Sequence, residues 1–563
     1  MCIVKNSGRG GGYLCRVGTF CAVFAGLFLF VQKILTPVWN YPDYTDQVDD
    51  VVAELNALPQ NSVEVLFLGA SHVGYGILPM DLYRERGIVT YNGGTSGQSL
   101  DSSLMFMLEA FKKQNPKLVV LDVSLIDRNP RTSGDKNKLR DNIPFGRNKV
   151  RFALAGGNGK EIRYNLKHLP ERWTKLVPFY EYHSRWKSLS RSSFTRFLPR
   201  KFFLLGYNAF SFINPFDRWA TEDEVAQRMV ARNVAHSREY NDGVYGEAWS
   251  DEKPLYAPFV YDGARRYISV MKYECERRGA KLLLIKVPAA NYPQYYSASW
   301  TLPKHDMAAQ LAAELKLPFF DLKYDVDIGM DWSEDTVDWG GHLNLLGARK
   351  VTPALGEYLA AHYPLVARQV PEIDAKFPLY DDLMWLADLQ LERDFSAYME
   401  RLKGSPHNLA VFFSVADTAL FESTDDEKRA LSEFGFRTDF YSAGYADSFL
   451  AVVDGGAVRF ERLSNREQAY AYQIDRKHSV GMWSSGWETA SRASIVFSAA
   501  GKSTEYALNW RGLNIVVYDK ESGLVLDSVC FDFWDTENRR ARRDSGRTKD
   551  LFLTYERYLT ERR

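Results

Sequence analysis

The sequence has no excess of positive or negative charge, and this balance argues against a nucleic-acid partner. Its 563 residues carry 71 basic and 71 acidic side chains, which gives a formal net charge of +0. A chain without a bulk positive field has little long-range attraction for nucleic acid, so we expect no nucleic-acid partner. The sequence also has no internal repeat and no low-complexity tract, which excludes a repeat protein or a disordered linker.

Cysteine is scarce as well. Three of the five cysteines, Cys2, Cys15 and Cys21, lie before or within an N-terminal apolar run. The other two, Cys275 and Cys530, could form one disulfide, but they do not make a disulfide framework. No pair has the C-x-x-C spacing of a metal site. We therefore expect two unpaired core cysteines, no metal and no cofactor.

What the sequence does have is a long apolar run near its N-terminus. Residues 17–31 carry no charge, and apolar residues continue past Lys33 to Trp39, which is just long enough to cross a bilayer if the lysine reaches the surface. No A-x-A-like cleavage site follows the run. Residues 1–40 are therefore predicted to be a short tail and a membrane anchor, with a cleaved signal sequence as the alternative.

Charges on either side of the run predict its orientation. Basic residues precede it and acidic residues follow it, namely Lys5, Arg9 and Arg16 before and Asp43, Asp46, Asp49 and Asp50 after. The positive-inside rule then places the tail in the cytoplasm and the bulk of the chain outside it. Export with so few cysteines favours a single-pass protein of a bacterial cell membrane over an animal secretory product.

The rest of the chain is long enough for at least two domains. The acidic residues 41–62 are predicted to form a stalk with a short helix. In residues 63–365, short apolar runs alternate with amphipathic segments, which is typical of an α/β domain with a doubly wound parallel sheet. A basic, aromatic segment at 127–251 is interpreted as a mostly helical insertion that either caps the sheet or contacts substrate. After a proline-containing break, residues 379–563 are predicted to be a mixed α+β domain.

The most informative segment is Val65–His72, an apolar run that stops at glycine, alanine and serine. A buried parallel strand that ends in a tight turn presents the next side chains at the carboxyl edge of the sheet, where open α/β folds keep their chemistry. A serine there becomes a nucleophile when a base takes its proton. Ser71 is therefore the candidate nucleophile.

A second segment, Asp338–His342, stands just before a predicted helix and supplies the residues that the serine lacks. Neutral histidine is the usual base because its pKa lies near working pH, and a carboxylate fixes its tautomer and orientation. We predict that His342 is the base and that Asp338 orients it, with Asp335 as the rival orienter. Taken alone, a D-x-x-x-H pair often only caps a helix.

Acyl transfer also needs donors for the oxyanion that forms when the serine attacks. The backbone N–H of Ser71 is one candidate, and the N–H of Gly97, in the turn after the second strand, is another. Asn92 either orders that turn or merely caps it.

Together these blocks resemble the SGNH (GDSL-like) hydrolase superfamily. The resemblance spans about residues 63–363 and rests on Gly69–His72, Asn92–Gln98 and Asp338–Ala348. The anchored layout is similar to the branch that includes the alginate O-acetylation proteins and the D-alanyl transfer protein of teichoic acid assembly. The resemblance implies flavodoxin-like layering and acyl transfer or ester hydrolysis on a cell-surface polysaccharide. It also implies a membrane-bound acyl-transfer partner if the protein is a transferase.

The same resemblance implies roles for individual residues, with two departures from the family pattern. It makes Ser71 the nucleophile, His342 the base and Asp338 the orienter. Where many members carry G-x-N-D in the third block, this chain has Asp122-Val-Ser124, so Ser124 is the stand-in for the asparagine oxyanion donor. Asp338 stands four residues before His342 instead of three, which leaves the orienter open.

The C-terminal domain carries a second resemblance. Residues 511–519, 521–523 and 531–534 predict a hairpin that ends in an aromatic cluster. With the helix at 425–434 and the segment 444–456, they resemble the interleukin-like EMT inducer (ILEI) domain, a β-sandwich-like fold similar to lectin modules of glycan enzymes. The segment order is permuted, so no ligand residue is carried over. The resemblance implies carbohydrate binding, with a purely structural role as the alternative.

The sequence therefore predicts a membrane-anchored serine acyltransferase or esterase. Its substrates would be O-acyl groups, in the first place O-acetyl groups, of a surface polysaccharide, and it would act through an acyl-serine. The alternative is a catalytically inactive glycan-binding or polysaccharide-assembly protein that keeps the same fold.

Overall fold

The chain forms two compact units. Unit 1 comprises Met1–Asn208 and Phe216–Asp374, and unit 2 comprises Ala209–Pro215 and Ala375–Arg563. The computed structural model describes residues 9–37, 48–124, 126, 135–155, 176–189, 193–194, 204–206, 262–289, 302–332, 334–337, 341–534 and 540–561.

Unit 1 is built on a five-stranded parallel sheet in the order β2-β1-β3-β4-β5. The strands are β1 (Val65–Leu68), β2 (Thr90–Asn92), β3 (Leu118–Asp122), β4 (Lys281–Lys286) and β5 (Phe319–Asp321). This order reverses between β1 and β3, and ligands of open α/β sheets bind at the carboxyl ends of the strands beside such a reversal. The predicted parallel α/β sheet is confirmed, and its topology singles out the exits of β1 and β3.

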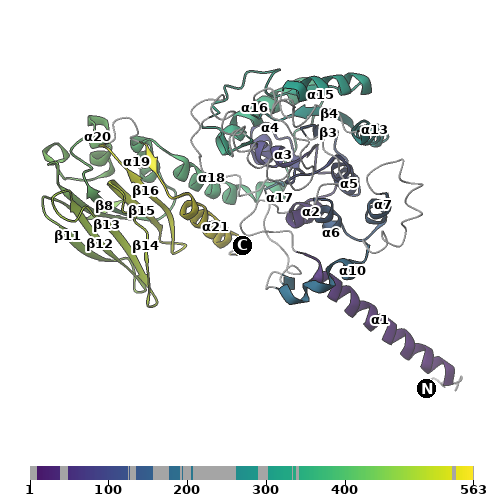
Figure 1. Ribbon diagram of the computed structural model, residues 1–563, viewed down its shortest axis with the longest axis horizontal. Helices are drawn as coiled ribbons and strands as arrows, with labels where there is room; N and C mark the ends of the chain where they lie inside the picture. The colour runs from purple at the N-terminus through teal and green to yellow at the C-terminus, as the bar shows by residue number, and fades with distance from the viewer. Residues whose placement is uncertain are drawn as a thin grey trace, which may run out of the picture. The chain divides into compact units, whose positions relative to one another are not determined.

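Helices cover both faces of this sheet (Figure 1). Three of them, α3 (Ser71–Gly76), α4 (Pro79–Arg86) and α16 (Leu345–His362), pack together with the side chains of Val65 and Phe67. Because side chains alternate along a strand, Leu66 and Leu68 point to the other face. There α5 (Leu100–Ala110) packs on β1 and against α13 (Asp262–Glu276), which packs on β4. Two further helices of unit 1 are α15 (Leu302–Leu315) and α17 (Pro371–Asp374).

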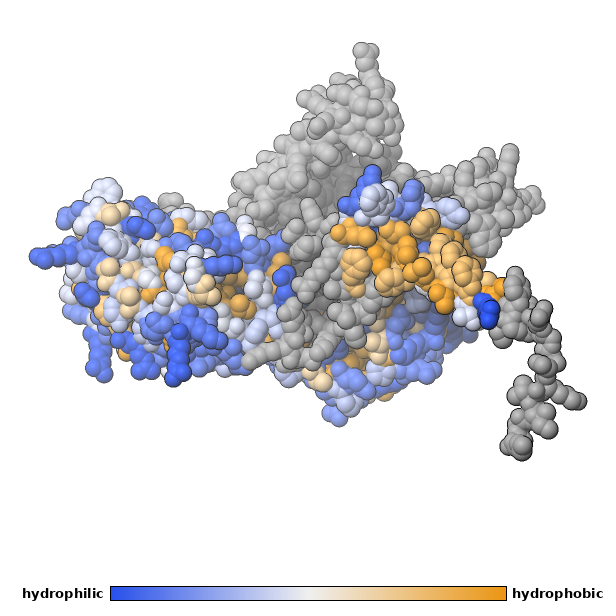
Figure 2. Space-filling view, turned by 90° about the horizontal axis from the view of Figure 1, so that it is seen from below, coloured by the Kyte–Doolittle hydropathy of each residue, from blue (hydrophilic) through white to orange (hydrophobic). Residues whose placement is uncertain are grey.

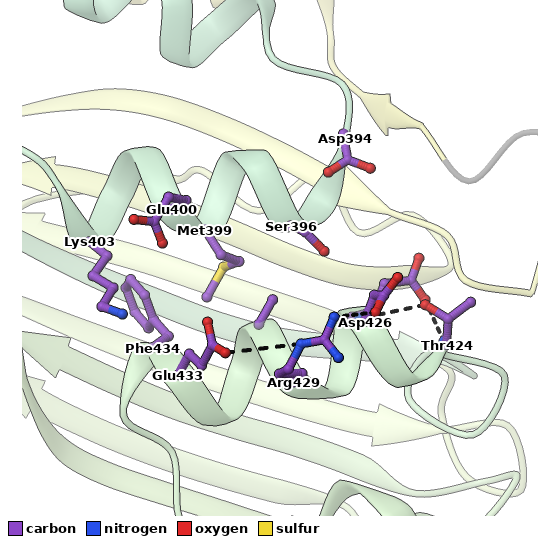
Figure 3. Close-up of a pocket in the computed structure, with 12 residues that line it drawn as sticks. Asp394, Ser396, Met399, Glu400, Lys403, Thr424, Asp426, Arg429, Glu433 and Phe434 are labelled. Carbon is purple, nitrogen blue, oxygen red and sulfur yellow. Dashed lines mark hydrogen bonds and ion pairs between the residues drawn. The ribbon is translucent and has the colours of Figure 1, made fainter.

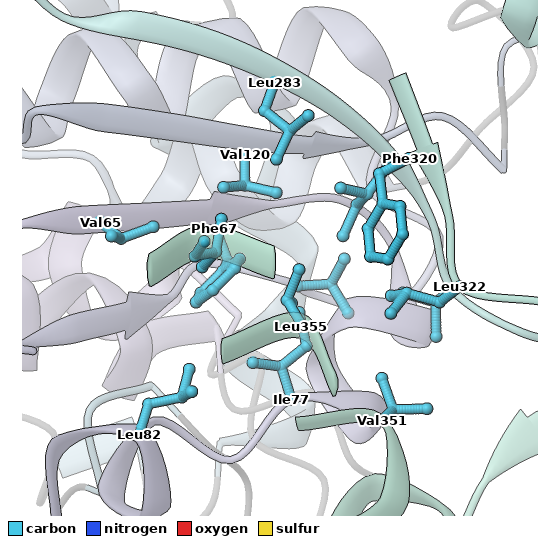
Figure 4. Packing of buried hydrophobic residues seen from close by; sticks show 14 of the residues in the cluster. Val65, Phe67, Ile77, Leu82, Val120, Leu283, Phe320, Leu322, Val351 and Leu355 are labelled. Atoms are coloured by element: carbon cyan, nitrogen blue, oxygen red, sulfur yellow. The ribbon is translucent and has the colours of Figure 1, made fainter. Parts of the chain in front are cut away.

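The core under α16 is made of apolar residues from five strands and three helices. Figure 4 shows Val65, Phe67, Val120 and Leu283 of the sheet facing Leu355 of α16. These side chains are at most 1% exposed, and burial of each stabilises the fold by about 1.5–3 kcal/mol. The sheet edge that carries the site is thus attached to a rigid core.

The N-terminal helix α1 (Arg9–Leu35) contains one window, Arg16–Leu35, that is long and apolar enough to cross a membrane by length and composition. Helix α2 (Val48–Ala57) lies in the predicted stalk, but its apolar face is buried in unit 1. Its carboxylate Glu54 is also buried and accepts the backbone N–H groups of Leu205 and Gly206, at 3.0 and 2.7 Å. Residues 48–58 are therefore part of the first unit, because Val51, Val52, Leu55 and Leu58 form an apolar stripe there.

The described parts of the predicted insertion 127–251 are mostly helical. They contain α6 (Asp135–Asn142), α7 (Arg147–Ala155), α10 (Pro178–Tyr182) and the 3₁₀-helix η3 (His183–Ser188). Helices α6 and α7 pack on α5, and α10 packs on α1.

Unit 2 is rich in β-structure, as predicted. Its helices are α18 (Phe377–Leu391), α19 (Phe395–Lys403), α20 (Asp425–Phe434), the 3₁₀-helix η7 (Phe440–Ser442) and α21 (Ser545–Glu561). Its strands are β8 (Leu409–Asp417), β9 (Ser448–Asp454), β10 (Ala457–Ser464), β11 (Gln468–Gln473), β12 (His478–Gly486), β13 (Ala493–Ala499), β14 (Lys502–Glu505), β15 (Gly512–Asp519), β16 (Leu524–Phe531) and β17 (Ala541–Arg542). The predicted hairpin is the antiparallel pair β15–β16.

The strands of unit 2 form one branched sheet. β8 pairs with β9 and β15 along most of its length and with β12 only at its end, through Ser485 and Gly486. Because the sheet branches there, Phe412 of β8 packs in one core with Ile495 of β13 and Val516 of β15. A second buried cluster is polar. Arg543 donates three hydrogen bonds to the fully buried Asp527 and forms an ion pair with it, and Asp527 also accepts from Tyr398.

The two cysteines beyond the N-terminal helix are both free and buried, Cys275 in unit 1 and Cys530 in unit 2. The prediction of unpaired core cysteines is confirmed.

Candidate functional site

Ser71 stands at the exit of β1, as the first residue of α3. Gly69, between strand and helix, has a φ of +157°, and a Cβ there would lie 2.8 Å from the Cβ of Asp122 on the neighbouring strand. Only glycine therefore permits the chain to turn this tightly against β3. As the first residue of the helix, Ser71 has a backbone N–H that no carbonyl of the helix can accept.

His342 comes from a different part of the chain and meets this serine. It begins β7 (His342–Leu343), which pairs antiparallel with β6 (Thr336–Val337) just before α16. Ser71 Oγ and His342 Nε2 are 2.7 Å apart, a hydrogen-bond distance, although 271 positions separate the two residues. When Nε2 is unprotonated it accepts the serine proton, which is the geometry that activates a hydroxyl.

Two aromatic side chains of α3 surround the imidazole. The ring centroids of His72 and His342 are 5.0 Å apart, and those of Tyr75 and His342 are 5.2 Å apart in an edge-on arrangement. Tyr75 stands four residues after Ser71 and so on the same face of the helix. From the sequence, only a tight turn is expected after the strand, and Tyr75 is not among the predicted site residues. Residues 71–76 are helical, which places Tyr75 beside His342.

The glycine block after β2 lies directly on α3. A Cβ on Gly94 would lie 2.5 Å from the backbone nitrogen of Gly74 and 3.0 Å from the carbonyl oxygen of Ala70. Asn92, fully buried, donates through Nδ2 to the carbonyl oxygens of Val73 and Ile77, at 2.8 and 3.0 Å. Its Oδ1 accepts the N–H of Gly94 at 3.0 Å. Asn92 thus joins the end of α3 to the glycine loop, which goes beyond capping a turn.

The turn that carries Gly97 is attached to the exit of β1. Thr95 N–H donates to the carbonyl oxygen of Gly69 at 3.3 Å, and Gln98 N–H closes the turn onto the Thr95 carbonyl at 3.1 Å. Gly97 has a φ of +64° in this turn, a conformation that favours glycine.

Ser124, the other candidate oxyanion donor, follows β3 and is directed to a neighbouring carboxylate. Its Oγ donates to Asp122 Oδ1 at 2.8 Å, and Val287 N–H donates to the same oxygen at 3.3 Å. The Ser124 hydroxyl proton is therefore bonded to Asp122 in this structure. Burial raises the pKa of Asp122 to about 6, even though the Ser124 hydroxyl, the Val287 N–H and the Lys286 amine all favour its ionised form.

Further charged groups line the same edge of the sheet. Lys286, at the end of β4, is almost fully buried, and its Nζ lies 3.7 Å from Oδ2 of the buried Asp321 at the end of β5. His305 Nδ1 lies 2.9 Å from that same oxygen. Three adjacent strands thus end in Asp122, Lys286 and Asp321, an alternation of charge that offsets part of their desolvation cost.

The structure describes only one of the two residues that were predicted to orient His342. Asp338 lies outside the described residues. Asp335 is buried, and its Oδ2 accepts from Lys350 Nζ and from the backbone N–H of Asp331, both at 2.6 Å. These bonds direct Asp335 to α16 and to its own loop, and no hydrogen bond joins it to His342.

It was not predicted from the sequence that Asp122 packs against Gly69, next to the nucleophile, and accepts a hydrogen bond from Ser124. The sequence pattern could have indicated this, because an acidic residue at the end of an apolar parallel strand lies at the same sheet edge as Ser71.

Unit 2 has a groove of its own between α19 and α20 (Figure 3). Its lining is polar and mainly acidic, with Arg429 bonded to Asp426 and close to Glu433. The lining residues are Asp394, Ser396, Met399, Glu400, Lys403, Thr424, Asp426, Glu427, Arg429, Ala430, Glu433 and Phe434.

No protein-family model and no curated protein matches the chain with significance. Among solved structures it resembles a GDSL-like lipase from Bacteroides thetaiotaomicron, at 14% sequence identity and a TM-score of 0.26, over 56% of this chain and 98% of that one. It also resembles a candidate acylhydrolase from Bacteroides fragilis, at 13% identity and a TM-score of 0.26, over 57% of this chain and 98% of that one. Because both TM-scores are low, these matches add no support for a shared fold or activity.

Proposed function

We propose that unit 1 is a serine acyl-transfer enzyme with Ser71 as nucleophile and His342 as base. The observation that carries this proposal is the 2.7 Å distance between Ser71 Oγ and His342 Nε2 at the carboxyl end of β1. Two side chains so far apart in sequence meet at the edge where the strand order reverses, which is where this class of sheet holds its ligands.

The proposed reaction proceeds in two steps. Ser71 Oγ attacks the ester carbonyl while His342 Nε2 takes the hydroxyl proton, and that proton then passes to the departing alcohol as the acyl–alcohol bond breaks. In the second step His342 deprotonates water or a sugar hydroxyl, which attacks the acyl-serine and restores Ser71. Water gives an esterase and a sugar hydroxyl gives a transferase.

The oxyanion of each step needs donors, and we assign it to the backbone N–H groups of Ser71 and Gly97. Ser124 is the weaker candidate because its hydroxyl is bonded to Asp122. Asp338 is proposed as the residue that orients His342, since the bonds of Asp335 lead to Lys350 and Asp331.

The substrate is proposed to be an O-acyl, in the first place O-acetyl, group of a bacterial surface polysaccharide. Two features support this: the apolar window Arg16–Leu35, which can hold the chain at a membrane, and the resemblance of the motifs to the envelope acylation branch of the SGNH superfamily. Unit 2, with its resemblance to the ILEI domain, is proposed to bind the glycan. A membrane-bound acyl carrier would be the partner of a transferase.

Turnover of p-nitrophenyl acetate by the full chain in detergent micelles tests the assignment. Ser71→Ala and His342→Gln should each lower kcat/KM by roughly 10³-fold or more, because members of a catalytic unit fail together. The half-buried Ser269 and the exposed His362 have side chains that bond only to their own helices, so Ser269→Ala and His362→Gln should leave kcat/KM unchanged.

Unchanged turnover by a folded Ser71→Ala variant would refute the mechanism. It would leave the alternative of a catalytically inactive glycan-binding protein. If Ser71 is required, an acetylated glycan distinguishes the two reactions: released acetate indicates an esterase, and a new ester on an added acceptor glycan indicates a transferase.

A further inference from the structure

A short helical segment, α10 with η3, lies along the last turns of the apolar helix α1. The ring centroids of Phe179 and Phe28 are 5.8 Å apart. Arg185 Nη1 donates to the carbonyl oxygen of Leu35, the last residue of α1, at 2.7 Å. Phe28 and Leu35 are seven residues apart, so the segment follows α1 over about 10 Å.

The inner side of this segment is attached to the α/β unit by buried polar contacts. Arg140 of α6 is 3% exposed, and its Nη2 lies 2.8 Å from Glu181 Oε2 and 2.9 Å from Asp141 Oδ1. Tyr182 Oη donates to Asp141 Oδ2 at 2.7 Å. Since α6 packs on α2 and α5, the segment has a defined position relative to both the sheet and α1.

The outer side of the segment exposes large aromatic rings. Tyr180 is 64% and Trp186 65% exposed, and Phe179 is 37% exposed beside α1. Lys187 Nζ lies 5.6 Å from the centroid of the Trp186 ring. Rings with one polar end, next to a long cationic side chain, are typical of the layer where lipid headgroups meet hydrocarbon.

The length of α1 gives an independent reason to place this segment in the lipid. Its exposed apolar residues extend from Val17 to Phe30 (Figure 2), whereas its C-terminal turn is buried in protein, at Gln32, Ile34 and Leu35. The exposed part is about 20 Å long at 1.5 Å per residue, and a bilayer has a hydrocarbon core of about 30 Å. The covered end of α1 would then lie in the outermost roughly 10 Å of the core, so the protein packed around it reaches the level where hydrocarbon meets headgroups. Helices α10 and η3 both touch α1 there.

We propose that α10 and η3 lie in the headgroup layer of the bilayer that α1 crosses, with Tyr180 and Trp186 in contact with lipid. This rests on the membrane span proposed for α1. The segment then holds unit 1 directly on the membrane surface, and the position of the catalytic edge relative to the bilayer is set by the α6 contacts rather than by a flexible tether.

Depth-dependent fluorescence quenching tests this with the full chain in phosphatidylcholine vesicles. Cys2, Cys15 and Cys21 are replaced by serine, and the buried Cys275 and Cys530 are retained. A bimane label is then attached to one new cysteine at a time, made by Phe24→Cys in α1, Trp186→Cys or Tyr180→Cys in the segment, or Tyr273→Cys. Tyr273 is the matched control, an aromatic residue of α13 that is 61% exposed.

The three kinds of position should differ. The label at 24 should lose fluorescence to nitroxide on the lipid acyl chains, and the labels at 186 and 180 should lose it to nitroxide at the headgroup while iodide in the water has little effect. The label at 273 should respond to iodide alone. If 186 and 180 respond like 273 while 24 stays lipid-quenched, the anchor stands and the inference is wrong. If 24 is also quenched by iodide alone, the membrane span itself fails, and the inference with it.

Discussion

Asp122 should make the stability of unit 1 depend on pH. Its carboxylate is 4% exposed behind the nucleophile turn, and burial raises its pKa from 3.8 to about 6. The Ser124 hydroxyl and Val287 N–H bond only Oδ1, and Oδ2 has no hydrogen-bond partner among the described residues. Because the carboxylate is buried and only one of its oxygens is hydrogen-bonded, the protonated form of Asp122 is favoured more than it is in water.

The sign follows from proton binding in the two states. Between about pH 4 and pH 6 the unfolded chain releases this proton while the folded chain retains it, so the unfolded state binds fewer protons. The free energy of unfolding therefore falls as pH rises through this window and is independent of Asp122 above and below it. The rise in the pKa of Asp122 from 3.8 to about 6 corresponds to about 3 kcal/mol over the whole window.

The variant Asp122→Asn isolates this effect. Its amide oxygen can still accept from Ser124 and Val287, but the side chain no longer titrates. The protein is unfolded with urea in micelles at pH 4 and at pH 7. Hydrogen exchange of the peptide that contains β3 monitors the unfolding, so the measurement reports on unit 1 alone. Between these values the stability of the wild type minus that of the variant should fall by about 2 kcal/mol, because part of the effect lies below pH 4.

A control and a refuting result complete this test. Asp426→Asn removes an exposed carboxylate in unit 2 and should not change the pH dependence of the β3 peptide. A stability difference between wild type and Asp122→Asn that stays constant from pH 4 to pH 7 would refute the reasoning. It would mean that Lys286 and the two hydrogen bonds keep Asp122 ionised in the folded state.

Three further substitutions test how the site and unit 2 are held. Gly94→Ala should lower the free energy of unfolding by about 1–3 kcal/mol and also lower kcat, because its Cβ would lie 2.5 Å from a backbone nitrogen of α3. Thermal melting and ester turnover measure the two effects. Gly481→Ala is the control: it has open space around it and should change neither. Asn92→Ala should destabilise unit 1 by roughly 2–4 kcal/mol in urea unfolding, since it leaves three buried backbone groups without a partner. Arg543→Met should lower the free energy of unfolding of unit 2 by about 3–5 kcal/mol in calorimetry, because Asp527 keeps a buried charge without its cation. A loss of only about 0.5 kcal/mol, as for a typical surface substitution, would contradict this.

The sequence was most informative where burial dictates the residue pattern. Strands β1, β3 and β4 contain continuous apolar runs because helices cover both faces of the sheet. The helix predicted at 425–434 is confirmed as α20, and Thr424 and Glu427 form a capping box at its start.

Local patterns failed where tertiary contacts decide the conformation. Helix α3 has six residues, two of them glycines, so its propensity alone predicts a loop. It is helical because the Asn92 side chain, from another strand, binds the carbonyl oxygens of Val73 and Ile77. The short helix predicted within 41–62 is α2, and its apolar stripe determines how it packs.

The convergence of Ser71 and His342 could be inferred from motif order, but its cause is visible only in the fold. The order β2-β1-β3 brings the exit of β1 beside that of β3, where Gly69 fits against Asp122. On the other side of the site, β7 is held by contacts that the sequence does not announce. Asn344 caps α16 through Gly347 N–H and donates to the carbonyl of Glu334, and Asn344 N–H bonds the carbonyl of Asp335. Motif spacing suggested Asp335 as a partner of His342. In the structure, Asp335 instead helps to position β7, the strand that carries His342.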